Sequence, residues 1–181
     1  MAPSAFARLW RKRRDGAGYA ALVTLMLTGL RSGEVRRLTW TDVQFGTTRY
    51  ANPVIVLPAH RMKARRDHVI PVCWQLALHL SEQPRWAGSD LVHPGSGSRS
   101  ISDMTLAMAM RRSDLGDYTP HGWRSTFRDW AAQAGWAREL AEHQLAHSVG
   151  SKVERAYQRD TLIEQRRPMM GEWGAYLVSK L

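Results

Sequence analysis

Cysteine is almost absent from this sequence. Cys73 is the single cysteine among 181 residues, so an internal disulfide framework is excluded, and one thiol cannot form a thiolate metal site alone. This usage is typical of a protein that works in a reducing compartment. We therefore expect a cytoplasmic location.

A membrane-spanning hydrophobic run is also lacking. The longest apolar stretch, Tyr19 to Leu30, has about the length of a buried helix and falls short of the roughly 20 residues that cross a bilayer. The basic segment at residues 8–18 loosely resembles the start of a secretory signal, but no small-residue cleavage pattern follows the apolar run. We predict no transmembrane segment and no membrane partner.

Acidic residues are few compared with basic ones. The chain has 26 Lys and Arg against 16 Asp and Glu, which gives a formal net charge of +10. An excess of this size favours binding to polyanions such as nucleic acid. Because net charge concerns association and solubility, the charge alone suits a merely basic protein equally well.

Hydrophobic patterns and turn residues predict mostly helices. We expect helices at 4–13, 17–28, 34–40 and 72–83, one capped by Ser102, one from 119, and two from the capping boxes at 151–154 and 161–164. β-Branched runs at 53–57 and 68–72 predict a hairpin, and residues 84–100 a long surface loop. The expected fold class is mainly α with a small antiparallel β-sheet (α+β), in one domain spanning 1–181.

The stretch TPHGWRSTFRDW, residues 119–130, combines a helix start with charged and aromatic side chains. Thr119 is a favourable N-cap and Pro120 a favourable first helical residue. At about 100° per residue, one face is expected to hold Trp123, Phe127, Trp130 and Ala134. The other face is expected to hold His121, Arg124 and Arg128.

His121 and Arg124 are then predicted to project together from the first turn of this helix. Free backbone N–H groups and the helix dipole favour an anion at that position, so the pair suits a phosphate or a carboxylate. The alternative is a solvated polar face that carries one histidine, since His-x-x-Arg by itself is common.

The segment TGLRSGEV, residues 28–35, places Arg31 between a glycine stop and another helix start. A planar guanidinium gives two parallel charged hydrogen bonds to a phosphate, so Arg31 and Arg124 together suit a phosphodiester. Glu34 could orient a neighbouring arginine or histidine, or be an ordinary acid of a first helical turn.

The segment LAHSVGSKVERAYQRD, residues 145–160, contains His147 and Tyr157. A tyrosine has a pKa near 10, so it attacks phosphorus only if its proton is removed and positive neighbours stabilise the phenolate. Arg155 and Arg159 supply positive charge. The alternative is that Tyr157 is an ordinary half-buried aromatic residue.

Taken in order, TGLRSGE, the lysine of the basic hairpin, HGWR, LAH and a tyrosine within AYQR resemble the catalytic domain of the tyrosine recombinases, or phage integrases. The sequence around these motifs is most similar to that of integrases of prophages and genomic islands, and the resemblance covers essentially the whole chain. It implies site-specific DNA cleavage and rejoining through a 3′-phosphotyrosyl link, with no metal and no cofactor.

The resemblance also implies a role for each matching residue. Arg31 and Arg124 hold the phosphate, His121 and His147 assist by hydrogen bonding and proton transfer, and Tyr157 is the nucleophile. Lys63 protonates the leaving 5′ oxygen, and Glu34 gives structural support. Further DNA contacts are predicted at Arg61, Arg65, Arg66, Arg128 and Arg155.

The implied partners are double-stranded DNA recombination sites in a bacterial nucleoid. Full-length relatives form tetramers on paired sites, whereas this chain is expected to be a monomer, as an excised domain or a truncated gene product without the family's preceding DNA-binding domains. Two departures are apparent: Tyr157 follows His147 by one residue more than in many relatives, and Pro168 is predicted to kink or end the last helix.

Three other functions remain open. His143 and His147 are four residues apart and could share a metal ion in a hydrolase, although no HExxH pattern or acidic third ligand accompanies them. The chain could also be a DNA-binding remnant of an integrase that forms no covalent adduct. A type IB topoisomerase is the third alternative.

Overall fold

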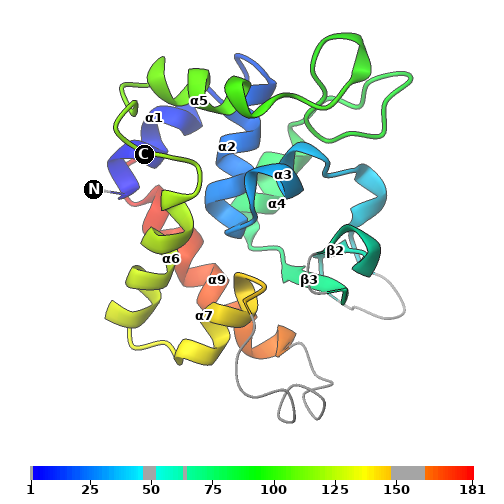
Figure 1. The fold of residues 1–181 in the computed structure, drawn as a ribbon. Helices are drawn as coiled ribbons and strands as arrows, with labels where there is room; N and C mark the ends of the chain where they lie inside the picture. Colours follow the sequence, from blue (N-terminus) through cyan, green and yellow to red (C-terminus); the bar gives the residue numbers. More distant parts are fainter. Residues whose placement is uncertain (1, 47–51, 63–64, 148–161) are drawn as a thin grey trace.

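The computed structural model describes residues 2–46, 52–62, 65–147 and 162–181. Over these residues the chain is mainly helical with one three-stranded antiparallel sheet (Figure 1), which confirms the expected fold class. The α-helices are α1 Ala2–Arg11, α2 Ala17–Thr28, α3 Ser32–Arg36, α4 Trp74–Ser81, α5 Asp103–Arg111, α6 Gly122–Gln133, α7 Arg138–Gln144 and α9 Ile163–Val178. Three short 3-10 turns are η1 Trp40–Asp42, η2 Ala59–Arg61 and η3 Ser96–Ser98.

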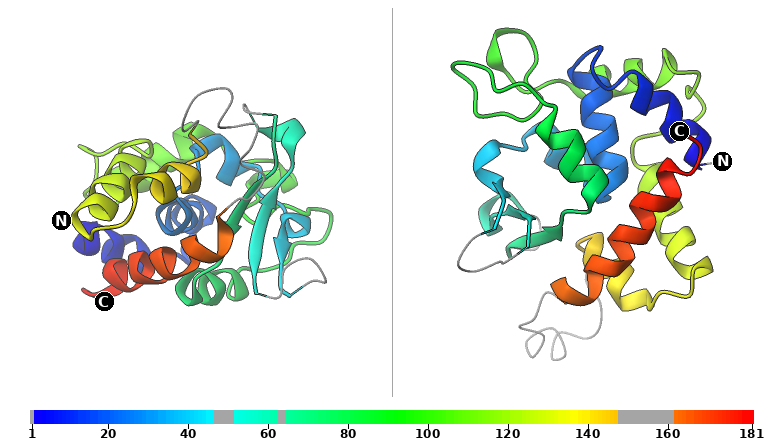
Figure 2. Two further views of the ribbon diagram at one scale, coloured as in Figure 1. Left: turned by 90° about the horizontal axis from the view of Figure 1, so that it is seen from below. Right: turned by 180° about the vertical axis from the view of Figure 1, so that it is seen from behind.

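Helix α2 forms the centre of the molecule. Its side chains are buried all round the helix from Ala20 to Thr28, as expected for a helix that is apolar on every face. Helices α1, α3, α4, α5, α6 and α9 all contact it, and the end-on view shows them around it (Figure 2). Gly29 adopts the left-handed conformation (φ 70°) and its N–H bonds to the Leu25 carbonyl, so the predicted glycine stop is confirmed.

The sheet lies beside this helical body (Figures 1 and 2). Strands β2 (Val54–Leu57) and β3 (His68–Pro71) form the predicted hairpin, with Leu57 opposite His68. Strand β1 (Val43–Gln44) adds a short antiparallel edge beside β2. The sequence did not predict β1, because two residues carry too little alternation to mark a strand.

Helix α3 differs from the prediction. It covers Ser32–Arg36, whereas the sequence predicted a helix at 34–40. The chain leaves the helix at Arg37 and forms η1, where the Asp42 carboxylate accepts the Thr39 backbone N–H at 2.9 Å. This local cap stabilises a separate turn over the later part of the predicted helix.

Other local signals agree with the structure. The Ser102 hydroxyl accepts the Thr105 N–H at 3.2 Å and caps α5 as predicted. Helix α9 runs on through Pro168, so the prediction that this proline could end the helix was wrong. The helix predicted from 161 corresponds to α9, while the one predicted from 151 lies outside the described residues.

Helix α6 begins at Gly122 with His121 as its N-cap residue. Pro120 therefore precedes the helix, and the Thr119 hydroxyl accepts the Gly122 N–H at 3.0 Å in the turn before it. The predicted N-cap was thus displaced by two residues. Trp123 and Phe127 are buried as predicted.

Two assignments to the faces of α6 were wrong. Arg124 was predicted on the polar face but is 3% exposed, and Ala134 was predicted on the apolar face but is exposed. Ala134 lies just past the helix end, beyond the packed neighbours. Ala131 occupies the buried face instead, and Trp130 packs against Trp173 of α9, with ring centroids 5.0 Å apart.

Helix α9 closes the fold. It contacts α1, α2, α4, α6, α7 and strand β3, and both chain ends lie at the same end of the molecule (Figures 1 and 2). The buried indole N–H of Trp173 donates to the Met26 carbonyl of α2 at 2.7 Å. Among the described residues, no helix combines the length and the apolar character needed to cross a membrane.

Candidate active site

Arg31 and Glu34 form the first part of the site, in the turn that joins α2 to α3. The Glu34 carboxylate accepts the Arg31 backbone N–H at 2.7 Å through Oε2 and the Arg31 guanidinium at 2.9 Å through Oε1. Its side chain is 10% exposed, whereas that of Arg31 is 36% exposed. Glu34 therefore orients Arg31, as the sequence suggested, and leaves part of the guanidinium open to solvent.

Arg124 forms the second part and is held almost entirely by buried acceptors. One terminal nitrogen donates to the carbonyl of Gly29. The other donates to the carbonyl of Leu145 at 2.6 Å and contacts Nε2 of His147 at 2.9 Å. These partners come from the end of α2 and the end of α7, so the guanidinium joins two segments far apart in the sequence.

His147 is the third part, and Glu142 of α7 fixes its ring. The Glu142 carboxylate lies 2.6 Å from Nδ1 of His147 and is largely buried. Since guanidinium nitrogens only donate, Nε2 of His147 must accept from Arg124, and Nδ1–H then donates to Glu142. Both ring nitrogens have protein partners in this arrangement, so a metal shared with His143, or proton transfer to DNA, would require His147 to release one of them. Among the described residues no group of three His, Cys, Asp or Glu could hold a metal ion.

The two arginines interact electrostatically. Burial, followed by repulsion from Arg31, lowers the pKa of Arg124 to about 10, while Glu34 and Glu142 act in the opposite direction. Arg124 still carries its charge at neutral pH. A pair of fixed cations with an oriented imidazole is suited to a doubly coordinated anion such as a phosphodiester.

His121 is not part of this cluster. It precedes α6 and its side chain is exposed. Its carbonyl accepts the Arg124 backbone N–H at 3.1 Å within the first turn of the helix, but no hydrogen bond joins its ring to the side chains of Arg31, Arg124 or His147. The sequence placed it beside Arg124 because the two were predicted to share the polar face of one helix. Arg124 instead turns into the core, while His121 and Arg128 stay at the surface.

The basic residues of the β2–β3 hairpin loop differ in their contacts. Arg61 donates to both Asp42 carboxylate oxygens, at 2.9 and 2.8 Å, and to the Arg37 carbonyl. These bonds link η2 to η1, so the guanidinium predicted to contact DNA has a structural role. Arg65 and Arg66 are exposed. Lys63, Arg155 and Tyr157 lie outside the described residues.

Three buried polar residues next to the site were not predicted. His68 of β3 contacts the Gln144 carbonyl at 3.1 Å, and the Arg166 guanidinium of α9 donates to the Gln144 side chain at 2.9 Å. Burial, reinforced by Arg166, lowers the pKa of His68 to about 3 and keeps it neutral. Each of them has a polar neighbour in the sequence, namely Asp67, His143, or Gln165 and Arg167, so no local pattern marks it as buried.

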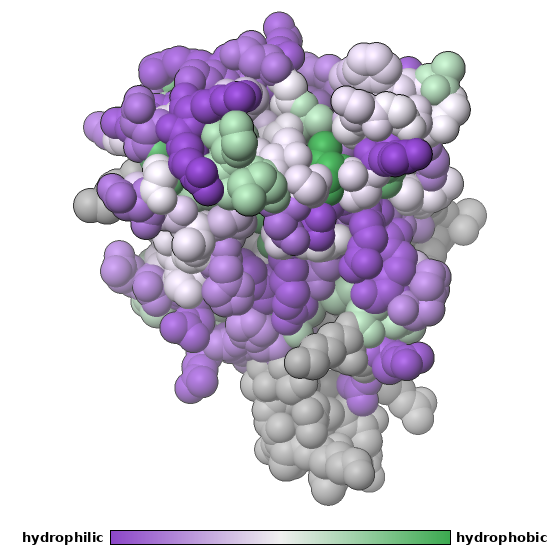
Figure 3. Space-filling view, turned by 45° about the horizontal axis from the view of Figure 1, so that its top comes forward, coloured by the Kyte–Doolittle hydropathy of each residue, from purple (hydrophilic) through white to green (hydrophobic). Residues whose placement is uncertain are grey.

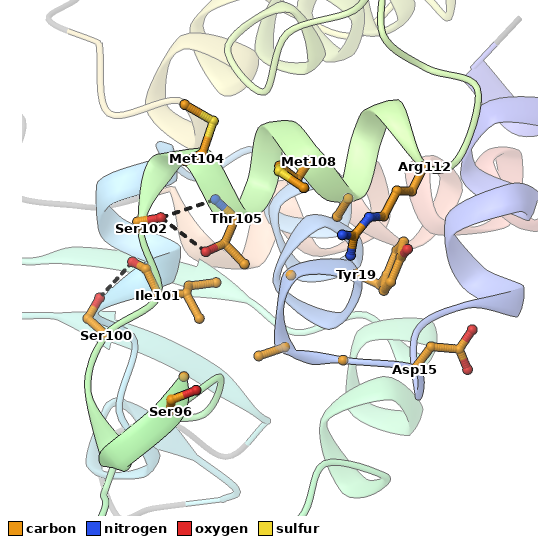
Figure 4. A pocket seen from close by; sticks show the side chains of 15 residues that line it. Asp15, Tyr19, Ser96, Ser100, Ile101, Ser102, Met104, Thr105, Met108 and Arg112 are labelled. Carbon is orange, nitrogen blue, oxygen red and sulfur yellow. Dashed lines mark hydrogen bonds between the residues drawn. The ribbon is translucent and has the colours of Figure 1, made fainter.

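A cavity between α2 and α5 is separate from this cluster. It measures about 520 Å³ and lies between the start of α2, the loop before α5, and α5 itself. Tyr19 and Arg112 lie at one end and Ser96 and Ser100 at the other (Figure 4). The face of the molecule drawn in Figure 3 is mainly hydrophilic, with small apolar areas. None of the predicted site residues lines the cavity.

The chain belongs to the phage integrase family. The model of the "Phage integrase family" matches residues 11–162, and the mainly helical fold with its small antiparallel sheet agrees with the catalytic domain of a tyrosine recombinase.

Curated relatives support the same family. Prophage integrase IntA of Escherichia coli (strain K12) is 32% identical over 157 residues, which covers 84% of this chain and 37% of that protein. Prophage integrase IntZ of the same strain is 33% identical with 84% and 38% coverage. The integrase of Enterobacteria phage P4 is 27% identical and covers 97% of this chain and 43% of that protein. The chain thus spans less than half of each of these relatives. No solved structure matches significantly.

Proposed function

We propose that this chain is the catalytic domain of a site-specific recombinase, which cuts and rejoins double-stranded DNA during integration or excision of a prophage or genomic island. The observation that carries the proposal is the cluster of Arg31, Arg124 and His147. Two guanidinium groups and an imidazole from separate parts of the chain are held by buried acceptors and carboxylates. A merely solvated set of basic residues would not need such a network.

The reaction that suits this cluster is transfer of a phosphoryl group from DNA to tyrosine. The Tyr157 oxygen forms a bond to phosphorus, the bond from phosphorus to the 5′ oxygen breaks, and the phenol proton passes to water. Lys63 supplies a proton to the 5′ oxygen that leaves. Because the new 3′-phosphotyrosyl ester keeps the energy of the broken bond, a second DNA strand can attack it without a nucleotide cofactor.

The cationic cluster stabilises the transition state of this transfer. Negative charge grows on the non-bridging oxygens as phosphorus gains a fifth oxygen, and preorganised donors stabilise that charge without moving. We assign this role to Arg31 and Arg124, with His147 as hydrogen-bond and proton-transfer partner. His121 has the same role in our proposal only if DNA binding draws its exposed ring toward the phosphate.

DNA affinity in this proposal comes from basic side chains around the cluster. Arg65, Arg66 and Arg128 are exposed among the described residues, and the net charge is +10. Contacts of this kind release counterions, so affinity falls steeply with added salt. We propose a cytoplasmic, nucleoid-associated protein that is monomeric alone and forms tetramers on paired sites as part of the longer proteins of the family.

The test uses a library of nicked duplexes with randomised sequence, because a nick lets the cut strand diffuse away and traps the covalent product. The chain is incubated with the library, adducts are separated on a denaturing gel, and their DNA is sequenced. We expect adducts that share a sequence motif and that are lost in Tyr157→Phe. Binding without any adduct would identify a DNA-binding remnant. Relaxation of supercoiled plasmid without site preference would identify a topoisomerase.

A further inference from the structure

Arg166 of α9 is a buried cation beside the proposed phosphate site. Its side chain lies within the core at 1% exposure. One terminal nitrogen donates to Oε1 of Gln144 at 2.9 Å and the other to the Val69 carbonyl at 2.6 Å. The guanidinium therefore ties α9 to the end of α7 and to strand β3.

Gln144 in turn bonds to the end of α2 and to strand β3. Since Arg166 can only donate, it holds the amide oxygen of Gln144 and directs the amide nitrogen to the other side. That nitrogen donates to the Thr28 carbonyl at 2.7 Å. The backbone carbonyl of Gln144 contacts His68 at 3.1 Å. The residue is thus anchored by both its side chain and its main chain.

The two backbone segments that Gln144 anchors are the ones that hold Arg124. Thr28 immediately precedes Gly29, whose carbonyl accepts one terminal nitrogen of Arg124. Leu145 immediately follows Gln144, and its carbonyl accepts the other terminal nitrogen. A shift of the Gln144 amide would displace both acceptors and so change the direction of the Arg124 guanidinium.

Packing alone does not account for a charge at this position. Well-packed apolar residues often replace a buried ionic group with no loss of stability, and Arg166 adds positive charge to a region that already contains Arg31 and Arg124. The same charge helps to keep His68 neutral. The geometric contribution of Arg166 is its fixed fork of donors, which a single apolar or ammonium group cannot reproduce.

We infer that Arg166 is a positioning residue: through Gln144 it fixes the carbonyls of Gly29 and Leu145 that orient Arg124 toward the scissile phosphate. This inference rests on the proposed function, because the phosphate that Arg124 would hold together with Arg31 is the scissile phosphate of that reaction.

The experiment compares Arg166→Met with Leu177→Ala, a buried apolar change in the same helix. The rate of adduct formation is measured at saturating protein on a nicked duplex recovered from the library. A second duplex carries a neutral methylphosphonate at the cleaved position. Arg31 and Arg124 have no charged oxygen to neutralise in this linkage, so a misplaced Arg124 should have a smaller effect on the rate of adduct formation.

We expect Arg166→Met to slow the reaction about 10- to 100-fold on the phosphate and no more than about threefold on the methylphosphonate. Leu177→Ala should slow both reactions by the same factor. Because Arg166 acts through Gln144, Arg166→Met combined with Gln144→Leu should be no slower than the slower single variant. If Arg166→Met does not fold, Gln144→Glu replaces it, since it keeps an acceptor for Arg166 and loses the donor to Thr28.

The outcomes separate the two proposals. Absence of any adduct with the unmodified chain contradicts the proposed function itself. A second outcome is that the unmodified chain forms adducts while Arg166→Met slows the reactions of both linkages equally, as Leu177→Ala does. That result overturns the positioning role and leaves the proposed function standing. The same holds for Gln144→Glu if it is used in place of Arg166→Met.

Discussion

Replacing Arg124 by methionine tests both the packing and the chemistry of the proposed site. Arg124 is 3% exposed, and its guanidinium bonds to the carbonyls of Gly29 and Leu145 and to His147. Methionine has a similar length but no donor. Two buried carbonyls then lose their donor, at about 1–3 kcal/mol each, while removal of a desolvated charge offsets part of that loss. We expect a net destabilisation of about 2–4 kcal/mol.

The effect on adduct formation should be larger than the effect on folding. Loss of one preorganised donor to a developing oxyanion costs about 10²–10³ in rate. At a temperature where urea titration shows the variant to be folded, we therefore expect adduct formation to fall by at least that factor. Arg31→Ala should slow the reaction by a similar factor.

Arg128→Met is the matched control for stability. Arg128 lies one turn later on the same helix, its side chain is 52% exposed, and its Nε lies 4.0 Å from the Asp129 carboxylate. The stability change should stay within about 0.5 kcal/mol. An Arg124→Met protein with unchanged stability, and with adduct formation within threefold of the original chain, would refute the reasoning for the whole site.

Three further predictions concern neighbouring groups. Glu142→Ala removes the acceptor of His147 Nδ1 and should slow adduct formation at least tenfold. An unchanged rate in a folded variant would contradict the orientation assigned to the His147 ring. Gly174→Ala should destabilise the protein by about 1–3 kcal/mol in urea titration, since the added Cβ would lie 2.7 Å from Cδ of the buried Gln75 and still closer to its Oε1. Equal or higher stability argues against this packing. Burial lowers the pKa of His79 from 6.5 to about 4, so the unfolded chain binds a proton between these values that the folded chain does not. The free energy of unfolding should therefore fall as pH drops from about 6.5 to 4, by about 1.4 kcal/mol per pH unit for this group. His79→Gln should reduce that slope. An identical slope in the variant would refute the assignment to His79.

Local signals in the sequence predicted much of the helical framework. Gly29 ends α2 and Ser102 caps α5 as predicted, because both effects involve backbone groups within a few residues. The β2–β3 hairpin followed from its β-branched residues and turn. The end of α3 was wrong because the competing cap at Asp42 depends on contacts within a separate turn.

The candidate site could be predicted in part. Motif order pointed to Arg31, Arg124 and His147. Glu34 was either an orienting residue or an ordinary acid of a first helical turn, and its bonds to Arg31 favour the first alternative. The placement of His121 beside Arg124 was wrong. A helical wheel treats arginine as a surface residue, and it does not include the acceptors that other segments supply inside the core.

The sequence by itself determined the fold class, the family and the residue types of the site, since these depend on local patterns and on the order of motifs. Only the tertiary structure decided that Arg124 is buried against the Leu145 carbonyl, that Glu142 fixes His147, and that Arg166 bonds to Gln144. Arg124 and Gly29 are 95 residues apart, and Gln144 and Thr28 are 116 apart. Hydrogen bonds over such separations exist only after the core has packed, so no local pattern encodes them.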